Sequence, residues 1–122
     1  AGGTRIGEAI HAFNERFGRR GMTRGAIVVI ASDGWERGDT TLLGREMARL
    51  RRRSYAVAWI NPLKGSPGYQ PLAAGMAAAL PHCDLFLPGH NLAALEGMTE
   101  ALASLDRMRR GTPRAVAHAS RP

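Results

Sequence analysis

The sequence predicts an α/β fold in which helices flank a parallel sheet. Three short apolar segments, residues 26–31, 55–60 and 84–87, are typical of strands. Helical patterns separate them, and strands that alternate with helices form parallel sheets with right-handed crossovers. The first strand has four consecutive β-branched residues at 27–30, which predicts burial on both faces of the sheet. The expected order is one helix followed by three strand–helix pairs.

Two of the expected helices have a defined start and an apolar stripe. The first, residues 4–18, has Thr4 as its expected N-cap and Gly18 as its expected C-terminal stop. The second, residues 40–52, is expected to begin after the N-cap Asp39 and to end in a run of arginines. Their inward stripes are Ile6, Ile10, Phe13 and Phe17 in the first helix and Leu43, Met47 and Leu50 in the second.

The remaining helices set the predicted domain boundary. A helix at residues 71–80 is expected to begin at Pro71, which suits a first helical turn, and to stop before Pro81. The last helix is expected to begin after the cap Asn91 and to continue to about residue 105. The period is then lost, so we divide the chain into a domain at residues 1–106 and a basic tail at residues 107–122 that we expect to be disordered.

Composition limits the class of protein. A chain of 122 residues, of which 44% are hydrophobic, suits one domain with a real core. No apolar run approaches the roughly 20 residues of a membrane helix, so no membrane partner is expected. The one cysteine, Cys83, excludes an internal disulfide framework, favours a cytoplasmic location and is expected to pack as a small hydrophobe.

The chain is basic, with a net charge of +7, and 16 of its 17 basic residues are arginine. Such a charge could indicate nucleic acid, anionic lipid or an acidic protein partner. The arginines cluster at the end of the second helix, residues 49–53, and in the tail, and the few aromatic residues do not interleave with them. We therefore expect solvated helix ends and a basic tail in place of a nucleic-acid interface.

Common catalytic motifs are missing from the sequence. The glycine-rich start at residues 2–7 is followed by no Gly-Lys-Ser/Thr, so it is neither a Walker loop nor a dinucleotide fingerprint. No serine lies in a Gly-x-Ser-x-Gly elbow, and Cys83 merely follows His82. No general acid–base pair or activated nucleophile emerges, and we expect no enzyme activity.

Oxygen chemistry remains. Thr4 offers a hydroxyl at a helix N-terminus, and Asp33 offers a carboxylate just after the first strand, where parallel sheets place their ligands. If the first helix packs beside the first strand, both oxygens face one crevice and suit a hard cation such as Mg²⁺. The alternative is that Thr4 only caps a helix and Asp33 only closes the turn before Gly34. Spacing alone does not decide between these two interpretations.

A series of motifs resembles a known family. Gly2-Gly3-Thr4 before a helix and Ser32-Asp33-Gly34 after a strand are similar to the second and third segments of the metal-ion-dependent adhesion site of von Willebrand factor A domains. Motifs in the same order downstream resemble the CoxE-like branch: residues 32–39 (SDGWERGD), 59–63 (WINPL), 67–69 (PGY), 75–82 (GMAAALPH) and 89–92 (GHNL). The resemblance covers roughly residues 1–105 and implies a Rossmann-like von Willebrand A fold, here with a partial three-stranded sheet.

One departure from the family is important. The resemblance implies Thr4 and Asp33 as metal-site positions, but the family's first metal segment, Asp-x-Ser-x-Ser, is absent. The chain would hold half a site, and we expect its own Mg²⁺ binding to be weak or absent. The simplest explanation is that this chain lacks the N-terminal strands. The strand edge at residues 27–31 would then be unpaired, and we expect self-association through it.

The resemblance implies an accessory or adaptor protein. CoxE-like proteins are associated with carbon monoxide dehydrogenase maturation, and relatives are paired with MoxR-type AAA+ ATPases. The implied partners are such an ATPase and a metalloenzyme client, with a partner carboxylate completing the Mg²⁺ coordination. Two alternatives stay open: a phosphoryl-transfer or receiver-like α/β domain that uses Asp33, and an arginine-driven nucleic-acid binder.

Overall fold

The computed structural model describes residues 5–62, 74–88, 92–109 and 117–118. The elements are α1 (Ile6–Phe17), β1 (Ile27–Ala31), α2 (Thr40–Arg53), β2 (Ala56–Asn61), α3 (Ala74–Ala79), β3 (Leu85–Pro88), α4 (Leu92–Arg109) and β4 (Ala117–His118), with 3₁₀ turns at Gly18–Arg20 and Leu80–His82. The sheet order is β1-β2-β3-β4, and every pair is parallel. The predicted α/β fold with parallel strands is confirmed.

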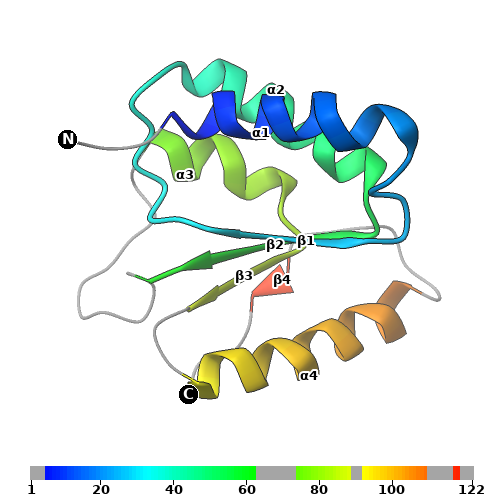
Figure 1. The fold of residues 1–122 in the computed structure, drawn as a ribbon. Coiled ribbons are helices and arrows are strands. Elements are labelled where there is room, and N and C mark those ends of the chain that lie inside the picture. Colours follow the sequence, from blue (N-terminus) through cyan, green and yellow to red (C-terminus); the bar gives the residue numbers. More distant parts are fainter. Residues whose placement is uncertain (1–4, 63–73, 89–91, 110–116, 119–122) are drawn as a thin grey trace.

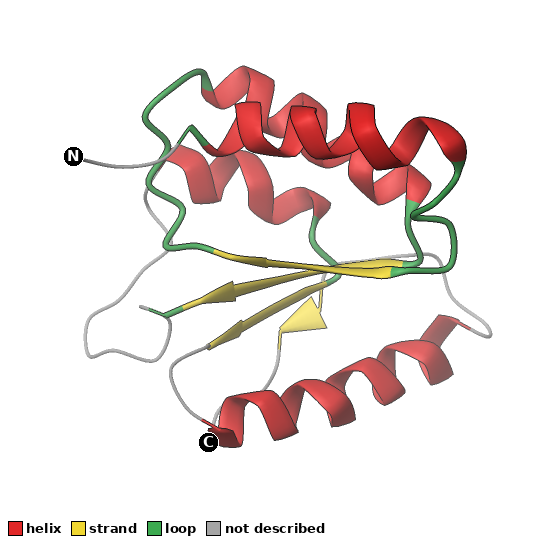
Figure 2. Cartoon of the chain, viewed as in Figure 1, coloured by secondary structure: helices red, strands yellow, loops and turns green. Residues whose placement is uncertain are grey.

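The sheet separates two helical layers (Figure 1). Helices α1, α2 and α3 cover one face, and α4 lies against the other. Figure 2 shows the same division between helices and strands. The larger core lies between the sheet and the three helices, and its fully buried members include Leu43, Met47, Trp59, Met76 and Phe86. The smaller core, beneath β2 and β3, consists of Ala56, Ala58, Leu85, Leu87 and Leu105.

Strand β1 corrects one prediction. It was expected to be buried on both faces, but Ile27 is 43% exposed and Val29 is 44% exposed. β1 is a terminal strand in the sheet order, and the α4 core lies under β2 and β3. The side chains of β1 that point toward the α4 face therefore lie outside that core, while Val28 and Ile30 pack against the three-helix core. Strand β2 is buried on both faces, with Ala56, Val57, Ala58 and Trp59 inaccessible, and so are Leu85, Phe86 and Leu87 of β3.

The residues that cap α1 and α2 differ in the hydrogen bonds that their side chains make. Asp39 caps α2 as predicted, because its Oδ1 accepts a hydrogen bond from the N–H of Thr41 at 2.8 Å. The expected cap of α1, Thr4, lies outside the described residues, and the residue at the N-cap position, Arg5, makes no side-chain capping bond. Helix α1 ends at Phe17 with Gly18 as its C-cap residue, as predicted. Gly18 has a φ of −71°, the chain continues into a 3₁₀ turn, and Gly21 then adopts the left-handed φ of 71°.

The second half of the chain departs slightly from the predicted bounds. Helix α4 continues to Arg109, three residues beyond the predicted domain boundary, and residues 117–118 of the predicted tail pair with β3. The predicted starts of two helices at Pro71 and Asn91 lie outside the described residues. Cys83 is buried, and burial raises the pKa of its thiol to about 12, in agreement with its predicted role as a packing residue.

A buried carboxylate, Asp84, joins both layers to the sheet. Its Oδ2 accepts a hydrogen bond from the N–H of Val57 in β2 at 2.7 Å. Its Oδ1 lies 3.0 Å from Nη2 of Arg109 in α4 and 3.6 Å from Nη2 of Arg51 in α2. Arg109 also donates a hydrogen bond to the carbonyl oxygen of Tyr55. The prediction that these arginines are merely solvated is wrong for Arg51 and Arg109, because each reaches an acidic group that is inaccessible to solvent.

A second buried carboxylate, Glu46, joins α1 to α2. Its oxygens accept hydrogen bonds from Nδ2 of Asn14 at 2.9 Å and from Nη1 of Arg49 at 2.8 Å, and Nδ1 of His11 lies 3.0 Å away. Burial raises the pKa of Glu46, but the hydrogen bonds from Asn14, His11 and Arg49 outweigh this effect and lower the pKa to about 2. Arg49, which also lies 2.9 Å from Glu15, is therefore a structural cation and not a solvated one.

Candidate metal and partner-binding site

The carboxyl ends of β1 and β2 meet at one edge of the sheet. The N–H of Ser32 continues the ladder beyond β1 by donating to the carbonyl oxygen of Ile60 at 3.0 Å. The indole Nε1 of Trp59 donates to the carbonyl oxygen of Ser32 at 2.8 Å, and Nδ2 of Asn61 lies 3.4 Å from the carbonyl oxygen of Asp33. The backbone that carries Asp33 is therefore held by the neighbouring strand.

Asp33 itself lies in a tight turn. Its Oδ1 accepts a hydrogen bond from the N–H of Trp35 at 2.9 Å, and Oγ of Ser32 accepts one from the N–H of Gly34 at 3.0 Å. Such local bonds are typical of Asx and Ser turns, and Gly34 supplies the left-handed conformation with a φ of 81°. The side chain of Asp33 is exposed. The turn-forming role is thus observed, and the bond to Trp35 uses one of the two carboxylate oxygens.

This turn packs directly against α3. A Cβ atom built on Gly75 would lie 2.0 Å from the carbonyl oxygen of Gly34, and one built on Gly34 would lie 2.4 Å from Cγ and Sδ of Met76. Only glycine permits this distance between two backbones. The two glycines therefore fix the height of the Asp33 turn above the three-helix layer.

The side chain of Glu36 caps the start of α1. Its carboxylate accepts hydrogen bonds from the N–H groups of Ile6 at 3.1 Å and Gly7 at 2.7 Å, and from the N–H of Gly38 at 2.7 Å. The carboxylate thus occupies the N-terminus of α1, where unpaired N–H groups and the helix dipole favour an anion. The sequence prediction missed this residue because the bond spans about 30 positions and leaves no local pattern.

Of the two predicted metal positions, the structure describes Asp33. Asp33 is at the carboxyl end of β1, and Glu36, three residues later, binds the start of the helix that follows Thr4. Thr4 itself lies outside the described residues. Glu36 connects the Asp33 loop to that helix.

The donor set fits a hard cation in kind but not in number. The groups at this edge are the hydroxyl of Ser32, the carboxylates of Asp33 and Glu36 and the amide of Asn61, all of which offer oxygen. Three N–H groups already bind Glu36, and Asn61 is buried with its Nδ2 near Asp33. In the part of the chain that the structure describes, no three His, Cys, Asp or Glu residues cluster as a metal centre. These residues could supply part of a Mg²⁺ coordination shell, with Asp33 as its accessible anion.

These features define a class: an open parallel α/β domain with an acidic turn at the carboxyl edge of its sheet. The family model for VWA domain containing CoxE-like proteins, where VWA denotes the von Willebrand factor A domain, matches residues 1–95. The chain therefore belongs to this family, whose wider class consists generally of non-catalytic adhesion or adaptor modules. Comparisons with curated proteins and with solved structures found no match.

The described helices give one further negative result. Among the helices at residues 6–17, 40–53, 74–79 and 92–109, none is both long and apolar enough to cross a membrane.

Proposed function

We propose that this chain is a non-enzymatic protein-binding module of the adaptor kind. In this proposal, Asp33 and Thr4 contribute part of a Mg²⁺ site, and an acidic residue of a partner completes it. The partner would be a MoxR-type AAA+ ATPase or its metalloenzyme client, and carbon monoxide dehydrogenase maturation is the expected context. Family membership supports the general role in protein interaction.

The observation that carries the proposal is the exposed carboxylate of Asp33, held on a rigid turn. Hydrogen bonds from neighbouring residues fix the backbone on both sides of it, whereas one of its oxygens has no partner among the described residues. A pre-positioned acidic group needs little reordering when a partner binds, which reduces the entropic cost of association. A hydrated Mg²⁺ ion is suited to such a site because it keeps several waters and needs only one or two carboxylates.

The alternative of a receiver-like or phosphoryl-transfer domain receives less support from this edge. Such chemistry would need further acidic ligands near Asp33. The next carboxylate, Glu36, already accepts three backbone hydrogen bonds, so it is committed to the end of α1. Incubation with acetyl phosphate and Mg²⁺ would test this alternative: a mass increase of one phosphoryl group that Asp33→Asn abolishes would favour it over the adaptor role.

The proposal is tested in two measurements. Titration calorimetry with MgCl₂ alone should show binding weaker than about 1 mM, since one accessible carboxylate compensates little for the dehydration of the ion. Co-purification with a co-expressed MoxR-type ATPase should then depend on Mg²⁺, be lost in EDTA, and be lost in Asp33→Ala.

The matched control is Glu100→Gln, which removes an exposed carboxylate from α4 on the other layer of the molecule. It should leave co-purification unchanged. If Asp33→Ala and Glu100→Gln retain the ATPase equally in the presence of Mg²⁺, the metal-bridged contact does not exist. Micromolar binding of Mg²⁺ by the isolated chain would show instead that the site is complete without a partner.

A further inference from the structure

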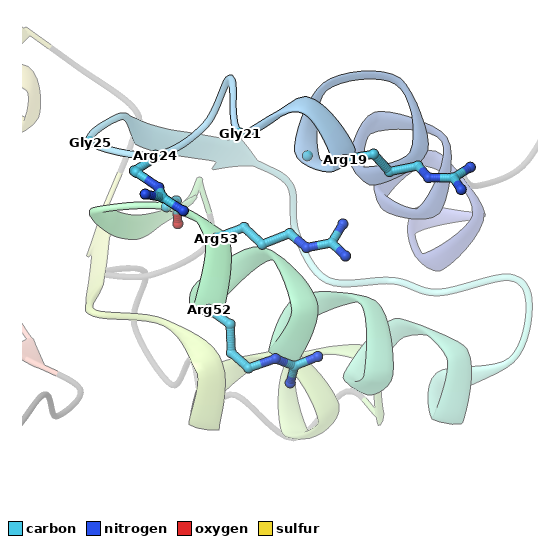
Figure 3. Close-up of a pocket in the computed structure, with 8 residues that line it drawn as sticks. Arg19, Gly21, Arg24, Gly25, Arg52 and Arg53 are labelled. Atoms are coloured by element: carbon cyan, nitrogen blue, oxygen red, sulfur yellow. The ribbon is translucent and has the colours of Figure 1, made fainter.

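A basic cavity lies at the other end of the strands from the Asp33 turn. Its volume is about 290 Å³, and its lining comes from the turn after α1, the loop before β1 and the end of α2. The lining residues are Gly18, Arg19, Gly21, Arg24, Gly25, Arg52, Arg53 and Ser54, and Figure 3 shows them together. We call this the arginine cavity. It lies at the amino ends of β1 and β2, so it is separate from the Asp33 turn.

Most of the charge of the arginine cavity is uncompensated among the described residues. Four of its eight lining residues are arginines, and none is acidic. Arg19 forms an ion pair with Glu15 at 3.0 Å, and Figure 3 shows its side chain extending away from the loop that carries Arg24. Arg24, Arg52 and Arg53 form no ion pair with any carboxylate among the described residues. Three cationic groups therefore remain for an anion.

Arg53 provides a second observation. Its Nη1 atom is buried and has no hydrogen-bond partner among the described residues, and a Cβ atom on Gly18 would lie only 3.1 Å from it. A buried N–H group without an acceptor is unfavourable, so this position calls for an acceptor atom. Asn14 Oδ1, also without a partner, lies beside the same glycine and could accept one of the five guanidinium N–H groups.

The lining also limits the ligand. No aromatic residue from the described part of the chain lines it, so these residues offer no surface on which a nucleobase could stack. Its volume is close to the lower limit for small-molecule sites, about 300 Å³. Planar guanidinium groups bind phosphate oxygens in a bidentate manner, which a single ammonium does not. Ser54 Oγ already donates to the carbonyl oxygen of Leu50, so side chains of arginine dominate recognition.

We propose that the arginine cavity binds the phosphate or pyrophosphate group of a small anionic ligand, with Arg24, Arg52 and Arg53 as its ligating residues. This site is independent of the proposed adaptor role, because it uses none of the residues at the Asp33 edge. It would give the module a second input that is sensitive to a phosphorylated metabolite or headgroup.

The test uses sodium pyrophosphate as the probe in titration calorimetry at constant ionic strength, with sodium chloride as the compensating salt. We expect saturable binding of one pyrophosphate per chain. Arg24→Gln and Arg52→Gln should each weaken it about tenfold, as expected for a lost hydrogen bond to a charged group. Arg53→Lys keeps the positive charge but loses the planar guanidinium group that binds phosphate in a bidentate manner, and it should weaken binding by a similar factor.

The matched control is Arg45→Gln, which removes the same charge from the same helix at a side chain that is 65% exposed and does not line the cavity. It should change the affinity less than twofold. Thermal unfolding without pyrophosphate checks that each variant is folded, and Arg24, which lies outside the helices and strands, keeps the test decisive if an α2 variant is unstable.

Two arms identify the source of the phosphate. Sedimentation with vesicles that contain phosphatidic acid, reversed by pyrophosphate, would assign the group to a lipid headgroup, whereas pyrophosphate binding without sedimentation would assign it to a soluble ligand. Three results would overturn the proposal. They are no saturable binding at millimolar pyrophosphate, equal loss in Arg45→Gln, and binding to a single-stranded oligonucleotide with which pyrophosphate does not compete.

Discussion

Replacement of Asp84 by asparagine tests how the two helical layers are attached to the sheet. The change keeps the shape of the side chain and one acceptor for the N–H of Val57, but it removes the negative charge between Arg109 and Arg51. Removing one partner of a buried ion pair costs about 3–5 kcal/mol, because a charge is left buried without compensation. The two arginine side chains are 17% and 19% exposed, so water reaches them in part and the lower limit, about 3 kcal/mol, is expected.

A loss of this size would lower Tm by about 10 °C in a domain of this length. It can be measured by urea unfolding, followed by circular dichroism, and by a thermal scan of the same samples. The control is Glu8→Gln, whose carboxylate is 61% exposed and 3.6 Å from Arg5, and which should cost no more than about 1 kcal/mol. If Asp84→Asn is as stable as Glu8→Gln, the carboxylate does not hold the layers together and the reasoning fails.

Three further predictions concern other parts of the fold. Because the pKa of Glu46 is lowered from 4.5 to about 2, its ionised form contributes about 3 kcal/mol to the free energy of unfolding above pH 4.5, and this contribution is lost as the pH falls toward 2. The free energy of unfolding of Glu46→Gln should therefore depend less on pH between 4.5 and 2. A pH dependence parallel to that of the unmodified chain would contradict this. The edge strand β1 should mediate self-association, so Val29→Lys should shift the sedimentation of the chain toward the monomer. If the unmodified chain is monomeric at all concentrations and its amides 27–30 are protected from hydrogen exchange, the edge is covered. Gly75→Ala should lower the free energy of unfolding, measured in urea, by about 1–3 kcal/mol. The control Gly44→Ala should not lower it, because a Cβ at Gly44 lies at an ordinary distance of 3.6 Å from its nearest neighbour. Equal effects of the two substitutions would contradict the close contact at Gly75.

The elements with local signals were predictable from the sequence. Helix α2 is an example: Asp39 caps it, and Leu43, Met47 and Leu50 recur at helical spacing and are all buried. The parallel order of the strands followed from their alternation with helices, and the short turn after β1 placed Asp33 at the correct edge. These features depend on neighbours within a few residues, which the sequence records directly.

The features that were missed depend on distant partners. Glu36 bonds residues about 30 positions away, and Asp84 reaches Arg109 across 25 positions, so neither carboxylate forms a local pattern. The exposure of Val29 was missed because hydrophobicity does not record which helix covers a strand. Glu46 did have a signal: it lies beside Met47 on the apolar stripe of α2, and a charged residue in such a place indicates a buried, paired carboxylate.

The contact between Gly34 and Gly75 couples the position of the Asp33 turn to that of α3. Two backbones at this distance cannot slide past each other without separating, so a force applied to Asp33 by a bound partner would be transmitted to the start of α3. The start of α3 would then respond to binding without itself contacting the partner. A side chain at either glycine would push the turn and α3 apart and would therefore change the position of Asp33.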